Sequence, residues 1–213
     1  MPMISGAVSN SEFIINSNID QYTIMKCSSR LATIPSLIFI IFLFQGCDND
    51  DPLPENQEEL ITTLSITLSP EGGGTIAHFL FYDPDGEGGI APVTSADTLQ
   101  SNTLYTAELT LLDESTAIPP DNITEEIRTE ADEHQFFFVV TGADLIHTYA
   151  DEDNLGFPLG LLNTFSSGTQ STGSMTVILR HEPDKAAPGV SLGLPELAGG
   201  ETDIEVVFPV KID

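Results

Sequence analysis

The sequence predicts a mainly β protein: a single antiparallel β-sandwich, immunoglobulin-like or similar, of seven to eight strands with one short acidic helix. Apolar and polar residues alternate in short runs from residue 60 onward, which is typical of strands with one buried face. Clusters of Gly, Pro, Asn and Asp separate these runs and indicate tight turns. Strand-like runs do not alternate with helices, so a parallel sheet is not expected.

The first two runs predict a hairpin. In residues 60–68, Leu64, Ile66 and Leu68 fall on one face and hydroxyl residues on the other. A turn of sequence PEGGG follows at 70–74, and residues 75–82 then run back along the first strand.

The later runs have the same character. In the last of them, Pro209 has no backbone N–H to donate, which predicts an edge or terminal strand. The runs are residues 103–112, 135–141, 145–149, 161–165, 175–180 and 204–210.

One helix is expected after Asn122, which is an N-cap residue with Glu125 at the third helical position. We expect its apolar stripe to pack on a sheet edge and its C-terminal end to lead into the apolar run 135–141. The opposite face is almost entirely acidic. The stripe consists of Ile123, Ile127, Ala131 and His134.

The N-terminal part has the layout of a secretory signal peptide. Residues 31–44 form an uncharged stretch of 14 residues, whereas a membrane-spanning helix needs about 20. Lys26 precedes the stretch and Gly46 follows it. We expect residues 1–24 to be a mis-assigned start, 25–46 the signal peptide, 47–59 an acidic tether and 60–213 the β-sandwich domain.

The segment Phe44-Gln45-Gly46-Cys47 resembles the lipobox of bacterial lipoproteins. It departs from the commonest pattern, because Leu43 is one place too early and Gln45 is large. The resemblance implies that Cys47 is the lipidated first residue of the mature chain, which would attach the protein to a membrane. Cys27 would leave with the signal peptide, so no thiol would remain for a disulfide or a catalytic site.

The run DNDD at 48–51 resembles the acidic export signal of surface-displayed lipoproteins of Bacteroidota. This resemblance implies an outer-membrane lipoprotein whose domain faces the cell surface. Two alternatives stay open: the domain faces the periplasm, or the run is only a solvated linker.

The charge distribution restricts the partners. The chain has 33 acidic and 6 basic residues, with a net charge of −27. Residues 1–46 hold two of each sign, so the whole net charge lies on residues 47–213. A surface this acidic repels phosphate backbones and anionic lipid faces, which excludes nucleic-acid binding and favours cations or cationic surfaces.

The strongest sequence candidate for a site is a calcium loop. Asp83, Asp85 and Glu87 alternate with Pro and Gly in the segment DPDGEGG, and calcium prefers several carboxylate oxygens on a tight loop. The segment resembles the first half of a D-x-D-x-D-G loop, but its Gly comes early and no bidentate Glu follows at the required spacing. Asp151 and Asp153 would contribute if the fold brought them near. The alternative is an ordinary acidic turn.

Enzyme motifs are not found. His181 and Glu182 begin like the zinc-protease pattern HExxH, but Lys185 stands where the second His should be and Pro183 would break the helix. We therefore expect no zinc site in this segment. The four histidines are widely spaced and are expected to be ordinary core or surface residues.

No nucleophile elbow or phosphate-binding loop occurs either, so the chain is not expected to be an enzyme. A separate short motif, Asp97-Thr98-Leu99, matches the O-glycosylation signal of Bacteroidota and points to Thr98 as a modified residue.

The lipobox, the acidic tether and the segments DPDGEGG, EHQFFF, LRHEP and GGETDIEV together resemble small surface lipoproteins of marine Bacteroidota, a group labelled "type 1 periplasmic binding fold superfamily protein". The label implies two α/β lobes, which a chain this short and strand-rich does not fit. This resemblance brings no known activity or site residues. The sequence as a whole favours a non-enzymatic binding, adhesion or structural role in the envelope. The alternatives are a glycan- or nutrient-capture accessory of an outer-membrane uptake system and a periplasmic ligand-binding protein; a hydrolase is the least favoured class.

Overall fold

The computed structural model describes residues 60–213 except 87 and 116–117. The predicted signal peptide, Cys47 and the tether lie outside the described residues. The described residues belong to one compact unit that covers 51–213. Within them, no helix has the length and apolar character needed to cross a membrane.

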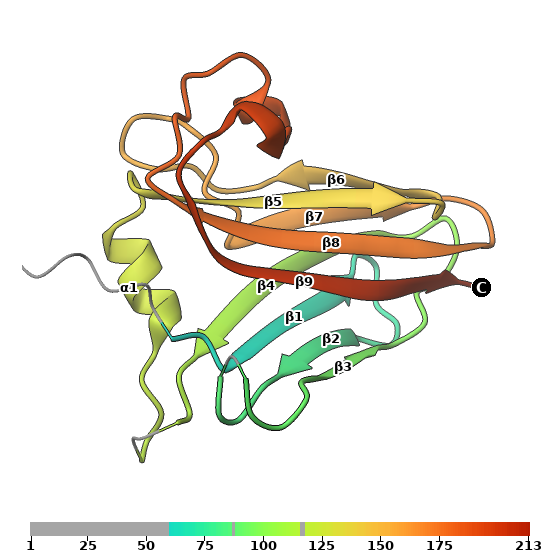
Figure 1. The fold of residues 1–213 in the computed structure, drawn as a ribbon. Coiled ribbons are helices and arrows are strands. Elements are labelled where there is room, and N and C mark those ends of the chain that lie inside the picture. The colour runs from blue at the N-terminus through green and yellow to red at the C-terminus, as the bar shows by residue number, and fades with distance from the viewer. Residues whose placement is uncertain (1–59, 87, 116–117) are drawn as a thin grey trace, which may run out of the picture. The chain divides into compact units, whose positions relative to one another are not determined.

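The fold is mainly β, as predicted, with nine strands in the described part of the chain (Figure 1). The elements are β1 (Thr63–Pro70), β2 (Ala77–Tyr82), β3 (Val93–Ala96), β4 (Leu104–Leu112), α1 (Ile123–Thr129), β5 (His134–Thr141), β6 (Leu145–Tyr149), β7 (Leu162–Ser167), β8 (Ser171–His181) and β9 (Glu201–Ile212).

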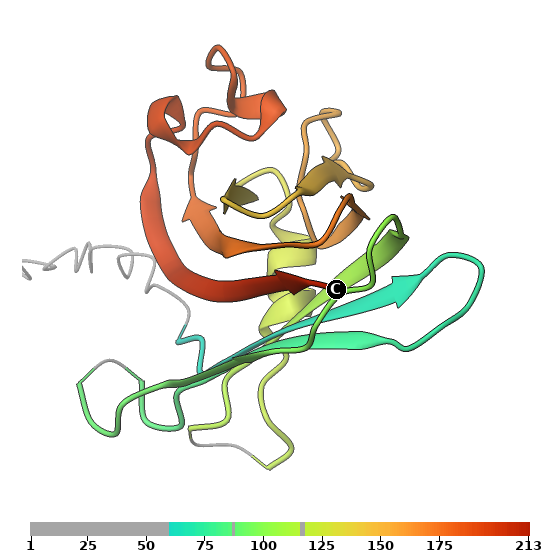
Figure 2. The ribbon, with the colours of Figure 1, turned by 90° about the vertical axis from the view of Figure 1, so that its right-hand side faces the viewer.

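The strands form two antiparallel sheets that pack face to face (Figure 2). The larger has the order β3-β2-β1-β4-β7-β6 and the smaller the order β5-β8-β9. The β1–β2 hairpin is confirmed by its register, in which Ile66 pairs with Phe79. The prediction from Pro209 is also confirmed, since β9 is an edge strand of the smaller sheet.

The core fills the space between the two sheets. Alternate residues of β1 and β4 enter it, as the period of two predicted, and Leu64, Ile66 and Leu68 are fully buried. Phe79 of the larger sheet and Phe208 of the smaller one meet with ring centroids 5.6 Å apart. Burial of this apolar surface is the main force that holds the layers together.

The helix is shorter than its apolar stripe suggested. It ends at Thr129, and His134 is the first residue of β5. Asn122 occupies the N-cap position, but its side chain makes no capping hydrogen bond. The helix does not pack on an edge strand either: the Thr124 hydroxyl exchanges hydrogen bonds with the backbone of Leu111 in β4, an interior strand whose last residues extend past β7.

Strand β3 was missed because it carries no clear period of two. Three of its four residues are exposed, and the exception, Ala96, is only half-buried. Strand β3 pairs with β2 at the edge of the sheet. An exposed edge strand needs few apolar residues, so the sequence shows no alternating pattern there.

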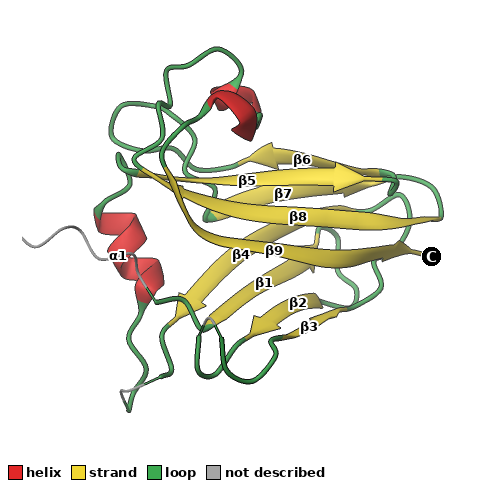
Figure 3. Ribbon diagram, viewed as in Figure 1, coloured by secondary structure: helices red, strands yellow, loops and turns green. Residues whose placement is uncertain are grey.

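The segment between β8 and β9 covers the outer face of the smaller sheet. The segment contains two short 3₁₀ turns, Val190–Leu192 and Pro195–Leu197 (Figure 3). A second apolar cluster forms beneath the segment, where Val190 and Ala198 pack with Phe137 and Ile178 of the sheet. The smaller sheet is thus buried on both faces at this point.

Candidate functional site

The residues of the predicted calcium loop follow β2. Asp83 is buried, whereas Asp85 is exposed, and the Asp85 carboxylate accepts a hydrogen bond from the backbone N–H of Ile90 at 3.1 Å. Glu87 lies outside the described residues. The Asp85 carboxylate therefore closes its own turn.

The second acidic loop connects β6 and β7, and its carboxylates also hold the loop itself. The Asp151 carboxylate accepts the backbone N–H groups of Gly160 at 2.7 Å and Leu162 at 2.8 Å. Oδ1 of Asp153 accepts the N–H groups of Leu155 and Phe157, both at 2.9 Å. These oxygens already have strong donors, which a cation would have to displace.

The two acidic loops lie at the same end of the larger sheet but do not converge. Strands β1, β4 and β7 separate β2 from β6, so the loops are four strand spacings apart, or about 19 Å. Calcium ligands lie within about 2.6 Å of the ion. The structure therefore does not bring Asp83 and Asp85 together with Asp151 and Asp153 around one ion.

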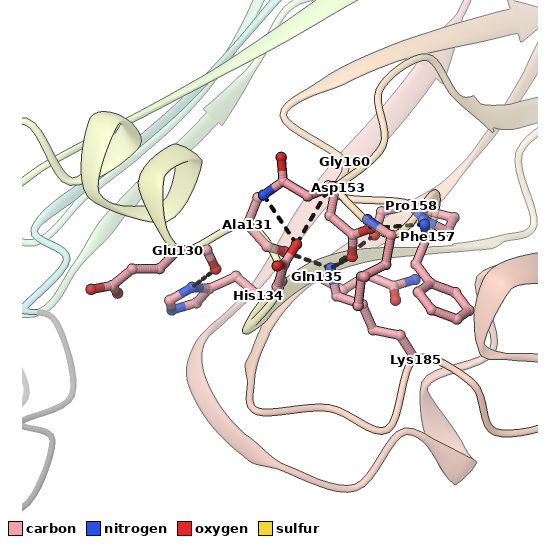
Figure 4. A network of polar contacts seen from close by, with 12 residues as sticks. Glu130, Ala131, His134, Gln135, Asp153, Phe157, Pro158, Gly160 and Lys185 are labelled. Atoms are coloured by element: carbon pink, nitrogen blue, oxygen red, sulfur yellow. Dashed lines mark hydrogen bonds and ion pairs between the residues drawn. The ribbon is translucent and has the colours of Figure 1, made fainter.

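Lys185 is buried instead of solvated (Figure 4). Its ammonium donates to Oδ2 of Asp153 at 2.8 Å, to the carbonyl of Ala131 at 2.6 Å and to the carbonyl of Pro158 at 3.4 Å. These acceptors belong to the α1–β5 connection and the β6–β7 loop, while Lys185 follows β8. One cation thus joins three segments that are distant in sequence.

The charge of Asp153 is stabilised by these contacts. Burial raises the pKa of Asp153, but hydrogen bonds from Lys185 and from the N–H groups of Phe157 and Leu155 lower the pKa more strongly, so it lies below its ordinary value. A buried pair with this many hydrogen bonds is a structural support. No local sequence pattern indicates this pair, because its two residues are 32 positions apart.

Tyr149 and His147 continue the polar network along β6. The Tyr149 hydroxyl donates to the carbonyl of Phe136 at 2.6 Å, and burial raises the pKa of Tyr149 to about 12. Burial lowers the pKa of His147, which is partly offset by its hydrogen bond to Asn163 at 2.7 Å. Both side chains are therefore neutral at pH 7.

Two histidines that are far apart in sequence meet across β5 and β8. His134 pairs with His181, and their rings stack with centroids 4.8 Å apart and an interplanar angle of 6°. Nδ1 of His134 lies 3.1 Å from the carbonyl oxygen of Glu130 (Figure 4), and Nε2 lies 3.9 Å from the buried carboxylate of Asp203. His134 is thereby fixed from two sides.

Two glutamates extend this histidine pair toward solvent. Glu182 donates its backbone N–H to the carbonyl of Glu133 at 2.6 Å, which continues the β5–β8 ladder by one pair. Oε2 of Glu133 lies 3.9 Å from Nε2 of His181. One potential metal-ligand atom from each of Glu133, His181 and Glu182 lies within 4.8 Å of the other two. The sequence does not indicate this cluster, because Glu133 is far from His181 and Glu182 along the chain. The register of β5 on β8 brings them together.

Hollows near these groups are acidic. One of about 270 Å³ lies beside Asp151 and Asp153, and another of about 410 Å³ lies beside Tyr149 and Glu152. A third, of about 470 Å³, follows the acidic side of α1. Sites for drug-sized organic ligands are usually mostly apolar, so these hollows do not resemble such sites.

The outer face of the larger sheet differs sharply from these acidic regions. Register places Ser69, Thr106, Thr164 and Thr148 in one row across β1, β4, β7 and β6. Glu108 is the one acidic side chain among the outward-facing residues of the six strands. These residues are Ser65, Thr67, Ser69, His78, Leu80, Tyr82, Val93, Ser95, Leu104, Thr106, Glu108, Thr110, Leu112, Ile146, Thr148, Leu162, Thr164 and Ser166. We call this surface the hydroxyl face.

Thr98, the predicted glycosylation residue, is exposed and follows β3. Cys47, the predicted lipidation residue, lies outside the described residues. Comparison of the chain with protein-family models, with curated proteins and with solved structures finds no match. Functional inference therefore rests on the residues of this chain alone.

Proposed function

We propose that this chain is a lipid-anchored lipoprotein of the outer membrane, displayed at the cell surface, with a binding or adhesion role and no enzymatic activity. The lipobox at Cys47 and the acidic run after it support the anchoring and the display. The observation that carries the binding role is the hydroxyl face, which has one acidic residue in a chain with a net charge of −27.

The separation of charge supports contact through this face. A charged side chain that is buried against a partner loses its hydration, and the centres of protein interfaces are accordingly depleted of charged residues. On the hydroxyl face, Thr106 and Thr148 are exposed and can exchange hydrogen bonds with a partner at little desolvation cost.

The chemistry of the face favours a neutral polysaccharide as the partner. Sugar hydroxyls donate and accept hydrogen bonds as Ser and Thr hydroxyls do, and a neutral chain is not repelled by the acidic surroundings. A second copy of this chain would be repelled. Tyr82 offers one aromatic ring on the face, and the chain has no Trp for stacking. The match between Ser and Thr hydroxyls and sugar hydroxyls makes a nutrient-capture accessory the second candidate function.

Lipidation is tested by labelling cells with radioactive palmitate and comparing the wild type with Cys47→Ser. We expect label on the wild type only, and loss of the wild type from intact cells treated with external protease. Equal labelling of both chains would contradict the anchor. Full protection from protease in labelled cells would indicate a domain that faces the periplasm.

The hydroxyl face is tested with Thr106→Glu/Thr148→Glu, which places two charges on it. The matched control is Thr172→Glu/Thr202→Glu, which adds the same charge to exposed positions on the smaller sheet. We expect the first variant to lose binding to insoluble neutral polysaccharides and the control to retain it. Binding that survives in both variants would show that contact is made elsewhere, and no binding by the wild type would exclude neutral polysaccharide.

A further inference from the structure

We infer that Glu133, His181 and Glu182 form a binding site for a divalent transition-metal ion of the zinc class. The geometry that points to this is the meeting of one imidazole nitrogen and two carboxylates, with ligand atoms within 4.8 Å of one another. The inference is independent of the lipid anchor and of the hydroxyl face.

The strand register brings like charges together. Glu133 and Glu182 are opposite one another, directly beyond the His134–His181 pair, and are joined by a backbone hydrogen bond of 2.6 Å. Two carboxylates directly opposite across strands repel each other. A cation between them would turn this repulsion into attraction, and the strongly negative chain raises the local concentration of cations.

His181 distinguishes this cluster from an ordinary solvated acidic patch. The His181 side chain is 6% exposed, and its Nε2 lies 3.9 Å from the carboxylate of Glu133. The parallel stack on His134, which is itself held near the Glu130 carbonyl, fixes the plane of the His181 ring. Such fixed orientation of a ligand histidine is what outer contacts supply in metal sites.

The donor set selects the class of metal. Zinc binds imidazole nitrogen and carboxylate oxygen at about 2.0–2.2 Å, and sites with three protein ligands leave the fourth position to water or to a partner group. Calcium needs about six to eight oxygens, which this cluster does not offer. Both glutamates are exposed, so rotation of their side chains can draw the three ligand atoms, which lie within 4.8 Å of one another, closer together around an ion.

This site is not the helical zinc-protease motif that the sequence excluded. Lys185, at the position of the second His in that motif, is buried against Asp153 and takes no part. The third ligand comes from Glu133 on the neighbouring strand connection. The prediction that residues 181–185 form no helical zinc motif is unaffected, because the proposed site joins the ends of two strands.

The test uses the full chain in detergent, stripped with a chelator and titrated with zinc chloride in a calorimeter. We expect one zinc ion per chain and no saturable binding of calcium at this site. Glu133→Gln/Glu182→Gln should weaken zinc binding by about tenfold or more, since two of three ligands are impaired. The matched control Glu126→Gln/Glu205→Gln removes the same charge from exposed positions on α1 and β9 and should bind zinc as the wild type does.

Equal loss of zinc affinity in both double variants would show that only the net charge matters and would overturn the site. Unchanged zinc affinity in Glu133→Gln/Glu182→Gln would overturn it as well. Because replacing the buried His181 endangers folding, its role is followed by nitrogen NMR of the imidazole. Zinc should shift the His181 ring signals and leave those of His78 unchanged, and an unmoved His181 signal would contradict the inference.

Discussion

Two lysine–aspartate pairs show how differently the same chemistry acts in two regions of this molecule. In the pair Lys185–Asp153 the side chains are 4% and 0% exposed, and the ammonium lies 2.8 Å from the carboxylate. In the pair Lys211–Asp213, at the C-terminal end, the side chains are 57% and 45% exposed. The first pair is held by hydrogen bonds from three segments, whereas the second is solvated on most sides.

The comparison shows that burial decides how strongly the fold depends on an ion pair, whereas pairing alone does not. An exposed pair gains little because water screens it, but a buried pair that loses one partner leaves a charge without hydration. In a chain with 6 basic residues, the burial of Lys185 makes one cation responsible for joining three loops.

The largest expected effect comes from breaking the buried pair with Lys185→Met. The variant keeps the apolar stem but leaves the Asp153 carboxylate and two carbonyls without the ammonium. We expect the free energy of unfolding to fall by about 3–5 kcal/mol, measured by urea denaturation followed by circular dichroism. A loss no larger than that of an exposed lysine variant would contradict the structural role.

The double variant Lys185→Met/Asp153→Asn sharpens the comparison. The amide oxygen that replaces the carboxylate can still accept the N–H groups of Leu155 and Phe157, while the uncompensated charge is gone. We expect the double variant to be more stable than Lys185→Met alone by about 1–3 kcal/mol. If adding Asp153→Asn destabilises further, the cost of Lys185→Met does not come from the stranded carboxylate.

Acid should weaken the wild type more than this double variant. The pKa of folded Asp153 lies below its unfolded value of about 3.9. Its stabilising contribution is therefore present above that unfolded value and is lost as the pH falls through the folded pKa. We expect the stability difference between the two proteins, from urea denaturation at stepped pH, to shrink below about pH 4. A difference that stays constant with pH would assign the stability to packing alone.

Tyr149→Phe provides a neutral counterpart to the buried ion pair. It removes the hydrogen bond from the hydroxyl to the carbonyl of Phe136, which should cost about 1 kcal/mol. Because the pKa of Tyr149 is raised to about 12, the folded state favours the neutral phenol, and this contribution is lost as the pH rises from about 10 toward 12. In ultraviolet titration, the amplitude of tyrosine ionisation near pH 12 should be smaller in the variant than in the wild type.

The smallest effect is expected for Lys211→Met, the matched control for Lys185→Met. Both Lys211 and Asp213 stay largely hydrated, so the melting temperature should equal that of the wild type within measurement error. A clear drop would mean that the C-terminal pair also supports the fold, and the contrast between the two pairs would fail.

Much of the fold could be predicted because its signals are local. The alternation of Leu64, Ile66 and Leu68 with hydroxyl residues indicates a strand with one buried face, and Pro209 indicates an edge. Strand β3 could not be predicted, since an exposed edge strand has little need for apolar residues. The apolar stripe overestimates the length of the helix, because His134 continues the stripe by coincidence and is the first residue of β5.

The candidate sites depended on contacts that no local pattern encodes. The acidic loops after β2 and β6 were visible in sequence, but their separation follows from the strand order. The meeting of Glu133 with His181 follows from the register of β5 on β8, and the row from Ser69 to Thr148 from the registers of four strands.

The sequence by itself determined the β class, the hairpin, the edge strand and the restriction of net charge to residues after 46, because periodicity, turn residues and charge are properties of neighbouring positions. Tertiary structure alone decided which charges are buried and which side chains meet. Lys185 and Lys211 are the same residue type in the sequence. They differ because two distant segments close around Lys185, whereas Lys211 stays largely exposed to water.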